Sequence, residues 1–159
     1  MLIGEILILL TLANGTPVII KDLLKDRFAR PIDGGANFLD GRPLFGPSKT
    51  FRGIFFSILV TSVWGALVGP SWEIGALVAS MAMAGDLFSS FLKRRMNLLA
   101  GGKATGLDQV PESLFPLLAC RVAIPLTALD IVVAVATFFV GEILLSRLLY
   151  HFHLREKPY

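Results

Sequence analysis

Residues 72–92 read WEIGALVASMAMAGDLFSSFL, a largely apolar run interrupted near its end by Asp86. A helix needs about 20 such residues to cross the roughly 30 Å hydrocarbon core of a bilayer. Similar runs occur along the chain, so the predicted spans are residues 2–20, 53–68, 72–92, 111–126 and 128–149. Hydrophobic residues make up 54% of the 159 residues, and the mean hydropathy is +0.69. A soluble domain of this length cannot bury so much apolar surface. The sequence therefore predicts an all-α integral membrane protein with about five transmembrane helices in a single membrane domain, residues 1–159.

The basic residues predict the orientation of these spans, because Lys and Arg in short loops stay on the cytoplasmic side. Of the 15 basic residues, all but Arg121 fall in the two long loops or at the C-terminal end. Five spans then place the N-terminus outside, and both long loops and the C-terminus in the cytoplasm. We expect a multi-pass protein of the plasma membrane with its site on the cytoplasmic side. The net charge of +3 reflects this asymmetry, so we predict no nucleic-acid partner.

The first long loop, residues 31–53, combines glycines, carboxylates and basic side chains. Glycine allows positive φ and close backbone approach, so successive N–H groups can surround a phosphate. Lys49 and Arg52 can neutralise the charge of that phosphate. The composition favours phosphate binding, and the alternative is a solvated basic loop that only obeys the orientation rule.

Asp86 lies near the cytoplasmic end of its predicted span. Carboxylates at membrane depth are costly and usually functional. Ser89, Ser90 and Lys93 follow three, four and seven residues later, so all three can share a helical face with Asp86. The alternative is a structural ion pair between Asp86 and Lys93.

The second long loop carries a glycine-rich stretch, residues 101–109, that contains Asp108 just before the fourth span. Two carboxylates from different elements, with basic residues and glycine loops around them, are what a magnesium–nucleotide site requires. Their hard oxygens bind the cation, and the phosphates complete its shell. Taken alone, Asp108 is as well explained as a helix cap or a turn residue. Asn14 and Thr16, at a break in the first span, are predicted to line a polar cavity.

Five short motifs together resemble a known family. The chain is similar to the CDP-archaeol synthases, small relatives of the CDP-diacylglycerol synthases, over nearly its whole length. The motifs are Ala13–Val18, Asp40–Gly46, Lys49–Gly53, Gly85–Leu87 with Ser90 and Lys93–Arg95, and Gly106–Gln109. The resemblance implies five membrane helices, a site on the cytoplasmic side, CTP as cosubstrate and Mg²⁺ as cofactor.

The resemblance also implies roles for individual residues. It makes Asp86 and Asp108 metal-binding carboxylates and catalytic residues, together with Lys93 and Lys49. It assigns substrate binding to Asn14, Asp40, Arg42, Thr50, Arg52, Ser90 and Arg94. The family often has a further carboxylate where this chain has Pro111, so either Glu112 takes the place of that metal ligand or the ligand is missing. Phe51 stands where the family commonly has tryptophan, which keeps an aromatic ring.

The implied reaction is transfer of CMP from CTP to a lipid phosphate with release of pyrophosphate, a step of phospholipid biosynthesis. We expect an oxygen of the lipid phosphate to attack the α-phosphorus of CTP in line, with no protein nucleophile. The sequence does not separate an archaeol-type lipid from phosphatidic acid. A rival of another class is a non-catalytic membrane protein that binds or transports an anionic solute.

Overall fold

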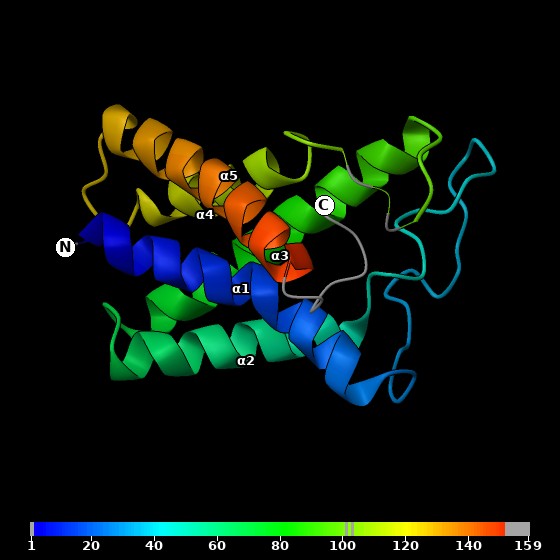
Figure 1. The fold of residues 1–159 in the computed structure, drawn as a ribbon, viewed down its shortest axis with the longest axis horizontal. Helices are drawn as coiled ribbons and strands as arrows, with labels where there is room; N and C mark the ends of the chain where they lie inside the picture. Colours follow the sequence, from blue (N-terminus) through cyan, green and yellow to red (C-terminus); the bar gives the residue numbers. More distant parts are fainter. Residues whose placement is uncertain (1, 101, 103, 152–159) are drawn as a thin grey trace.

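The computed structural model describes residues 2–100, 102 and 104–151, and this part of the chain is helical. It contains five helices, shown in Figure 1. They are α1 (Leu2–Leu24), α2 (Phe51–Leu67), α3 (Trp72–Arg95), α4 (Gln109–Cys120) and α5 (Ala128–His151). Within the described residues the only β pairing is two isolated bridges inside the first long loop and at its end. The prediction of an all-helical chain is confirmed.

Three of the helices are long and apolar enough to cross a bilayer by themselves. These are α1, α3 and α5, while α2 is a shorter apolar helix of 17 residues. The fourth predicted span was wrong in its extent, because α4 has only 12 residues and ends at Cys120, not at residue 126. Pro125 lacks a backbone N–H and restricts the residue before it, so the apolar sequence continues there without the helix.

α1 continues to Leu24, past the predicted end at residue 20, although it contains Pro17. Proline cannot donate a backbone hydrogen bond to the residue four positions earlier, which here is Ala13. The hydroxyl of Ser57 on α2 donates to the Ala13 carbonyl oxygen instead, at 2.7 Å. This bond satisfies the freed carbonyl and ties α1 to α2 at the depth of the proline.

The helices alternate in direction, so the connections gather at two ends of the molecule. In Figure 1 the loop after α1 and the loop after α3 both lie toward the right-hand end. The N-terminus, the turn between α2 and α3, and the connection between α4 and α5 lie at the left-hand end. The two long loops therefore share one end of the molecule, which we call the loop end.

α3 is the central helix and packs against α1, α2 and α4. Its glycines allow the close approach. A β-carbon added at Gly85 would lie 2.3 Å from the carbonyl oxygen of Pro111 on α4, and one at Gly75 would lie 2.4 Å from that of Thr61 on α2. The apolar core lies where α1, α3, α4 and α5 meet, around Ile6, Leu9, Leu10, Val78, Leu117, Ile131 and Phe138.

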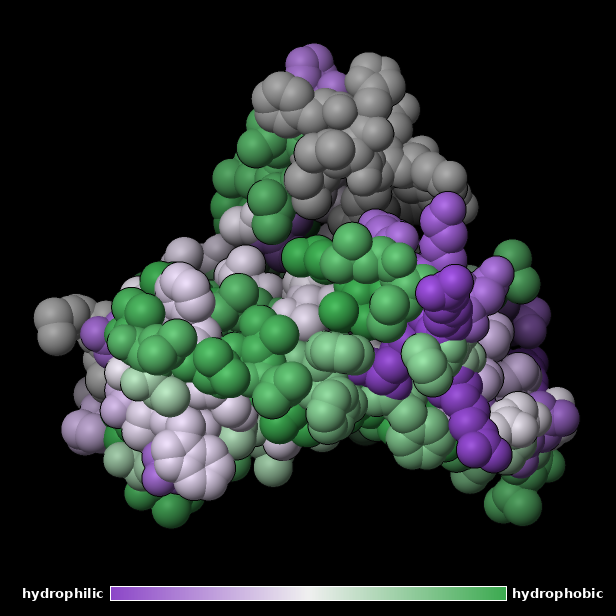
Figure 2. Space-filling view, turned by 90° about the horizontal axis from the view of Figure 1, so that it is seen from below, coloured by the Kyte–Doolittle hydropathy of each residue, from purple (hydrophilic) through white to green (hydrophobic). Residues whose placement is uncertain are grey.

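The outer surface is apolar away from the loop end. Many large apolar side chains of α2 and α5 are exposed, among them Phe55, Leu59, Val63, Leu129, Val132 and Leu144. Figure 2 shows hydrophobic residues over much of one face and hydrophilic residues gathered toward the right-hand, loop end. Such a surface fits hydrocarbon around the helices and water at the loops.

Candidate active site

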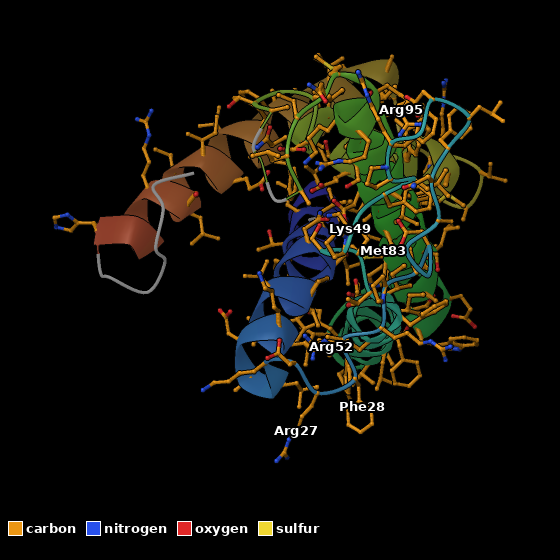
Figure 3. The ribbon with its side chains drawn as sticks, turned by 90° about the vertical axis from the view of Figure 1, so that its right-hand side faces the viewer. Arg27, Phe28, Lys49, Arg52, Met83 and Arg95 are labelled. Carbon is orange, nitrogen blue, oxygen red and sulfur yellow. The ribbon has the colours of Figure 1, made fainter. Side chains whose placement is uncertain are left out.

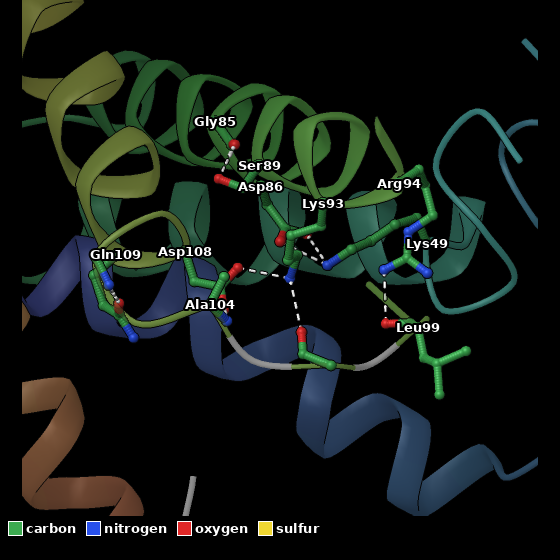
Figure 4. Close-up of polar contacts among 12 residues, drawn as sticks. Lys49, Gly85, Asp86, Ser89, Lys93, Arg94, Leu99, Ala104, Asp108 and Gln109 are labelled. Carbon is green, nitrogen blue, oxygen red and sulfur yellow. Dashed lines mark hydrogen bonds and ion pairs between the residues drawn. The ribbon is translucent and has the colours of Figure 1, made fainter. Parts of the chain in front are cut away.

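An ion pair between the first long loop and α3 marks the candidate site. The ammonium nitrogen of Lys49 lies 2.6 Å from both carboxylate oxygens of Asp86 (Figure 4). Lys49 directly precedes Thr50, whose hydroxyl accepts from the backbone N–H of Gly53 at 3.3 Å and so caps the start of α2. This cap anchors the end of the first long loop to α2, and α3 supplies the Asp86 carboxylate. The alternative interpretation of Asp86, a structural ion pair with Lys93, is wrong, because Asp86 pairs with Lys49.

Lys93 pairs instead with Asp108, 2.6 Å away across the second long loop. Lys93 also donates to the carbonyl oxygen of Gly102 at 3.2 Å, and Asp108 accepts from the backbone N–H of Ala104 at 2.9 Å (Figure 4). The Asp108 side chain makes no capping bond to α4. The sequence left open whether Asp108 caps a helix or belongs to a turn. The structure supports a turn residue whose carboxylate is held by Lys93.

A cavity of about 480 Å³ opens beside the Lys49–Asp86 pair. Its walls come from the end of α1, the end of the first long loop, the start of α2 and the middle of α3. Four predicted site residues line it, namely Lys49, Thr50, Arg52 and Asp86. Figure 3 looks at the loop end and shows Lys49 and Met83 near its centre, with Arg52 between the ends of α1 and α2.

The α1 wall of this cavity was missed by sequence reasoning. It consists of Pro17, Lys21 and Asp22 of α1, with Lys25, Asp26 and Ala29 just beyond the end of the helix. A signal was present, because the two lysines and the two aspartates are each four residues apart and so lie one helical turn apart. The orientation rule accounts for these lysines in the sequence without giving them a role in the site.

Arg52 lines the cavity, but its guanidinium is also a structural clamp. It is 8% exposed and donates to the carbonyl oxygens of Lys25, at 2.5 Å, and Arg27. These carbonyls follow the end of α1, where backbone oxygens lack helical partners. Arg52 thus fixes the end of α1 against the start of α2.

Asp40 and Arg42 lie outside the cavity, in a contact between the tip of the first long loop and the end of α3. Arg42 donates to the carbonyl oxygen of Arg95 at 2.5 Å, and Arg95 donates to that of Pro43 at 2.7 Å. Arg95 also pairs with Asp40 at 3.1 Å and lies over the rings of Phe38 and Phe91, at 4.8 and 4.9 Å. We call Phe38, Asp40, Arg42, Phe91 and Arg95 the Arg95 cluster.

Asp33 stabilises the first long loop through hydrogen bonds between parts of the loop itself. Its carboxylate accepts from the backbone N–H groups of Gly35, Phe45 and Gly46 at 2.9–3.0 Å. Partial burial alone would raise the pKa of Asp33, but the hydrogen bonds from Gly46, Gly35 and Phe45 outweigh it and hold the pKa below the ordinary value of 3.8. Sequence reasoning did not single out this carboxylate, although Asp before Gly-Gly is a common turn signal.

The remaining predicted residues do not line the cavity. The Asn14 side chain donates back to Leu10 of its own helix at 3.0 Å. Arg94 donates to the Leu99 carbonyl at 2.8 Å, and the Ser90 hydroxyl is buried with no hydrogen-bond partner among the described residues. Glu112 is 7% exposed, and its carboxyl lies next to that of Asp86.

The carboxylates are not arranged as a ready-made cluster. Within residues 2–100, 102 and 104–151, no three side chains of His, Cys, Asp or Glu are grouped so as to hold a metal ion. Asp86 and Asp108 are paired with different lysines, whereas Glu112 adjoins Asp86. The predicted ligand set therefore divides into a neighbouring pair, Asp86 and Glu112, and a separate Asp108.

The long apolar helices alternate in direction, and a charged cavity lies toward the loop end. These features define a multi-pass membrane protein with a polar site at one end of its helices. A family model described as CarS-like, CDP-archaeol synthase, matches residues 7–78 and 70–159. The chain belongs to this family.

Relatives and a solved structure agree with this placement. The CDP-archaeol synthase of Sulfurisphaera tokodaii is 32% identical over 153 residues, covering 92% of this chain and 89% of that protein. That of Hyperthermus butylicus is 40% identical over 104 residues, but these cover 62% of this chain and only 59% of that protein. A structure described as an intramembrane enzyme for archaeal membrane lipids biosynthesis matches with a TM-score of 0.75 at 28% identity, over 87% of this chain and 89% of that one.

Proposed function

We propose that this protein transfers CMP from CTP to a lipid phosphate and releases pyrophosphate. The observation that carries the proposal is the Lys49–Asp86 pair at the wall of a cavity of about 480 Å³, in a chain of the CDP-archaeol synthase family. The cavity holds cations for phosphates beside a carboxylate for a metal ion, and it adjoins apolar helices along which a lipid can lie.

The proposed orientation places the loop end in the cytoplasm of a cell whose plasma membrane contains the protein. Both long loops carry most of the basic residues, and basic loops stay on the cytoplasmic side. CTP would then reach the cavity from the cytoplasm, while the lipid would arrive from the bilayer. All five helices would lie within the membrane, with the short α4 packed against α3.

The reaction needs positioning and charge stabilisation more than protein chemistry. A lipid phosphate is ionised at neutral pH, so its oxygen can attack the α-phosphorus of CTP without a protein base. Lys49 and Arg52 face the cavity and can stabilise the negative charge that builds on the phosphorus and on the departing pyrophosphate. Arg52 is held by carbonyl oxygens and Lys49 by Asp86, so both cations are placed before the substrate arrives.

The carboxylate oxygens of Asp86 and its neighbour Glu112 are suitable ligands for a magnesium ion. Asp86 and Glu112 offer neighbouring carboxyl oxygens, and the Lys49 ammonium already places a positive charge against both oxygens of Asp86. Mg²⁺ prefers one or two carboxylates together with phosphate oxygens. When bound, the ion would neutralise charge on the triphosphate of CTP. We assign Asp86 and Glu112 to hold it, with Asp108 as a further candidate.

The test is pyrophosphate release by detergent-purified protein given CTP, Mg²⁺ and a lipid phosphate. Two lipids are offered separately, an unsaturated archaeol-type ether phosphate and phosphatidic acid. We expect release that requires both substrates and falls at least about a hundredfold in Asp86→Asn, since the charge paired with Lys49 is removed. Asp130→Asn, at the opposite end of the molecule, is the matched control and should retain activity. Folded protein that releases no pyrophosphate with either lipid would overturn the proposal in favour of a non-catalytic anion-binding protein.

A further inference from the structure

Two lysines on the α1 wall of the cavity have no ion-pair partner among the residues that the structure describes. Lys21 and Lys25 both line the cavity and both are exposed. Among the described residues neither has a carboxylate within ion-pairing distance, whereas Lys49 and Lys93 each have one at 2.6 Å. Neither lysine falls within the motifs that carry the family resemblance. Their charges are therefore available to a ligand in the cavity.

The position of Lys25 is fixed by its backbone. α1 ends at Leu24, and Lys25 follows with φ of 46°, a left-handed conformation that non-glycine residues rarely adopt. Its N–H still donates to the Lys21 carbonyl at 2.9 Å, and its own carbonyl accepts from the buried guanidinium of Arg52 at 2.5 Å. A helical hydrogen bond and an inter-helix clamp thus hold the two lysines one turn apart.

Exposed apolar side chains lie along the same end of α1, with Val18 on the side of the two lysines and Ile19 and Leu23 on the opposite side of the helix. Val18, Ile19 and Leu23 of α1 are 45%, 59% and 72% exposed. The cavity itself also has apolar walls at Pro17, Ile54, Met83 and Leu87. A ligand that carries a phosphate on long apolar chains matches both features, because its phosphate can meet the lysines while its chains lie along α1.

The aspartates beside the lysines argue against the nucleotide as the anion at this wall. Asp22 and Asp26 also line the cavity, so the four charged residues of the α1 wall sum to zero formal charge. A triphosphate with its several negative charges gains little from such a wall. A single phosphate can contact the two ammonium groups and stay farther from the carboxylates.

We propose that Lys21 and Lys25 form a subsite for the phosphate of a lipid, on the α1 wall of the cavity and opposite the Lys49–Asp86 pair. The inference rests on the proposed function, in that this lipid phosphate is the acceptor of CMP. It assigns recognition of the two substrates to different walls. The α1 wall takes the lipid phosphate, and Lys49 with Arg52 takes the nucleotide.

The experiment measures binding without turnover. Thermal unfolding of the detergent-purified protein is followed with dodecyl phosphate, with dodecanol, and with CTP plus Mg²⁺. The double variant Lys21→Gln/Lys25→Gln keeps the length of most of each side chain and removes the charge. Arg27→Gln is the matched control, because Arg27 belongs to the same segment but points away from the cavity (Figure 3). Both variants should fold normally, because exposed side chains without partners contribute little to stability.

We expect dodecyl phosphate, and not dodecanol, to raise the unfolding temperature of the wild type and of Arg27→Gln. The double variant should bind dodecyl phosphate at least about tenfold more weakly, because it loses two charged contacts to phosphate, while its response to CTP is unchanged. In the turnover assay the KM for the lipid should rise and the KM for CTP should not.

Two outcomes would overturn the inference. If the double variant loses its response to CTP and keeps that to dodecyl phosphate, the lysines bind the nucleotide. If it keeps both responses, they bind neither. The unfolding measurement needs no pyrophosphate release, so it separates the two proposals. If the wild type is inactive but responds to dodecyl phosphate, and the double variant does not respond, the proposed reaction is refuted and the phosphate subsite is supported.

Discussion

Removal of the Arg95 side chain is expected to release the tip of the first long loop from α3. The Arg95→Ala variant loses the ion pair with Asp40, the hydrogen bond to the Pro43 carbonyl and the stacking on two rings. The ion pair with Asp40 contributes well under about 1 kcal/mol to stability, because the Asp40 side chain is 37% exposed and water screens the charges. A charged hydrogen bond contributes about 1.5 kcal/mol and two partly exposed cation–π contacts about 0.5 kcal/mol each.

The total is about 3 kcal/mol of local stability, which applies to opening of the loop and not to global unfolding. Hydrogen exchange in detergent, resolved to residues 36–44, measures this quantity. Backbone N–H groups of Phe38, Gly41 and Leu44 are hydrogen-bonded across the loop, so they report its closure. A loss of about 3 kcal/mol accelerates their exchange roughly a hundredfold.

The matched control is Arg121→Ala, an exposed arginine beyond the end of α4. It should leave exchange in residues 36–44 unchanged. Arg95→Lys keeps the positive charge but loses the planar guanidinium, so we expect hydrogen exchange in residues 36–44 to accelerate by an intermediate amount. Unchanged protection of residues 36–44 in Arg95→Ala would refute the reasoning, because the loop would then be held by its internal bonds alone.

Three further predictions concern the same end of the molecule. The bonds to the Asp33 carboxylate stabilise the loop above pH 3.8, the ordinary pKa, and are lost as pH falls through the lower folded pKa. Protection of residues 36–44 against exchange, relative to an unstructured chain at the same pH, should therefore fall in acid, but not in Asp33→Asn, where it is already low. Gly85→Ala forces α3 and α4 apart and should lower stability by about 1–3 kcal/mol in thermal unfolding, whereas Gly141→Ala, with nothing within 4 Å, should not. Lys93→Ala leaves a carboxylate unpaired and should destabilise the protein more than Lys93→Ala with Asp108→Ala, which a double-mutant cycle would detect as a coupling energy.

Hydropathy predicted the existence of the helices better than their ends. The apolar stretch through residue 126 predicts one span, yet α4 stops at Cys120. A hydropathy window counts transfer free energy and ignores whether each residue can donate the next helical hydrogen bond. At Pro17 the opposite happened, since α1 continues through the proline with help from the Ser57 hydroxyl on another helix. Neither outcome is encoded in the apolar pattern itself.

The partners of the charged residues were harder to predict than their presence. Asp86 and Lys93 share a helical face, but seven residues correspond to a rise of about 10.5 Å, which is too far for a direct ion pair. Each therefore pairs with a residue from a different loop, Lys49 and Asp108 respectively. Spacing along one helix gave the candidates, whereas the pairing depends on how the two loops fold back onto α3.

The arginines show why motif chemistry alone does not separate substrate contacts from structural ones. Arg42 donates to carbonyls at the end of α3, and Arg52 donates to carbonyls just beyond α1. The end of a helix presents unpaired carbonyl oxygens with partial negative charge, and a planar guanidinium can reach two of them at once. A glycine-rich loop with an arginine is therefore suited to a phosphate and to a helix end alike. Lys21 and Lys25 line the cavity, and within the described part of the chain their ammonium groups donate no hydrogen bond to such carbonyls. Arginine-to-lysine exchange at positions 42 and 52 should accordingly loosen the loop end rather than preserve it.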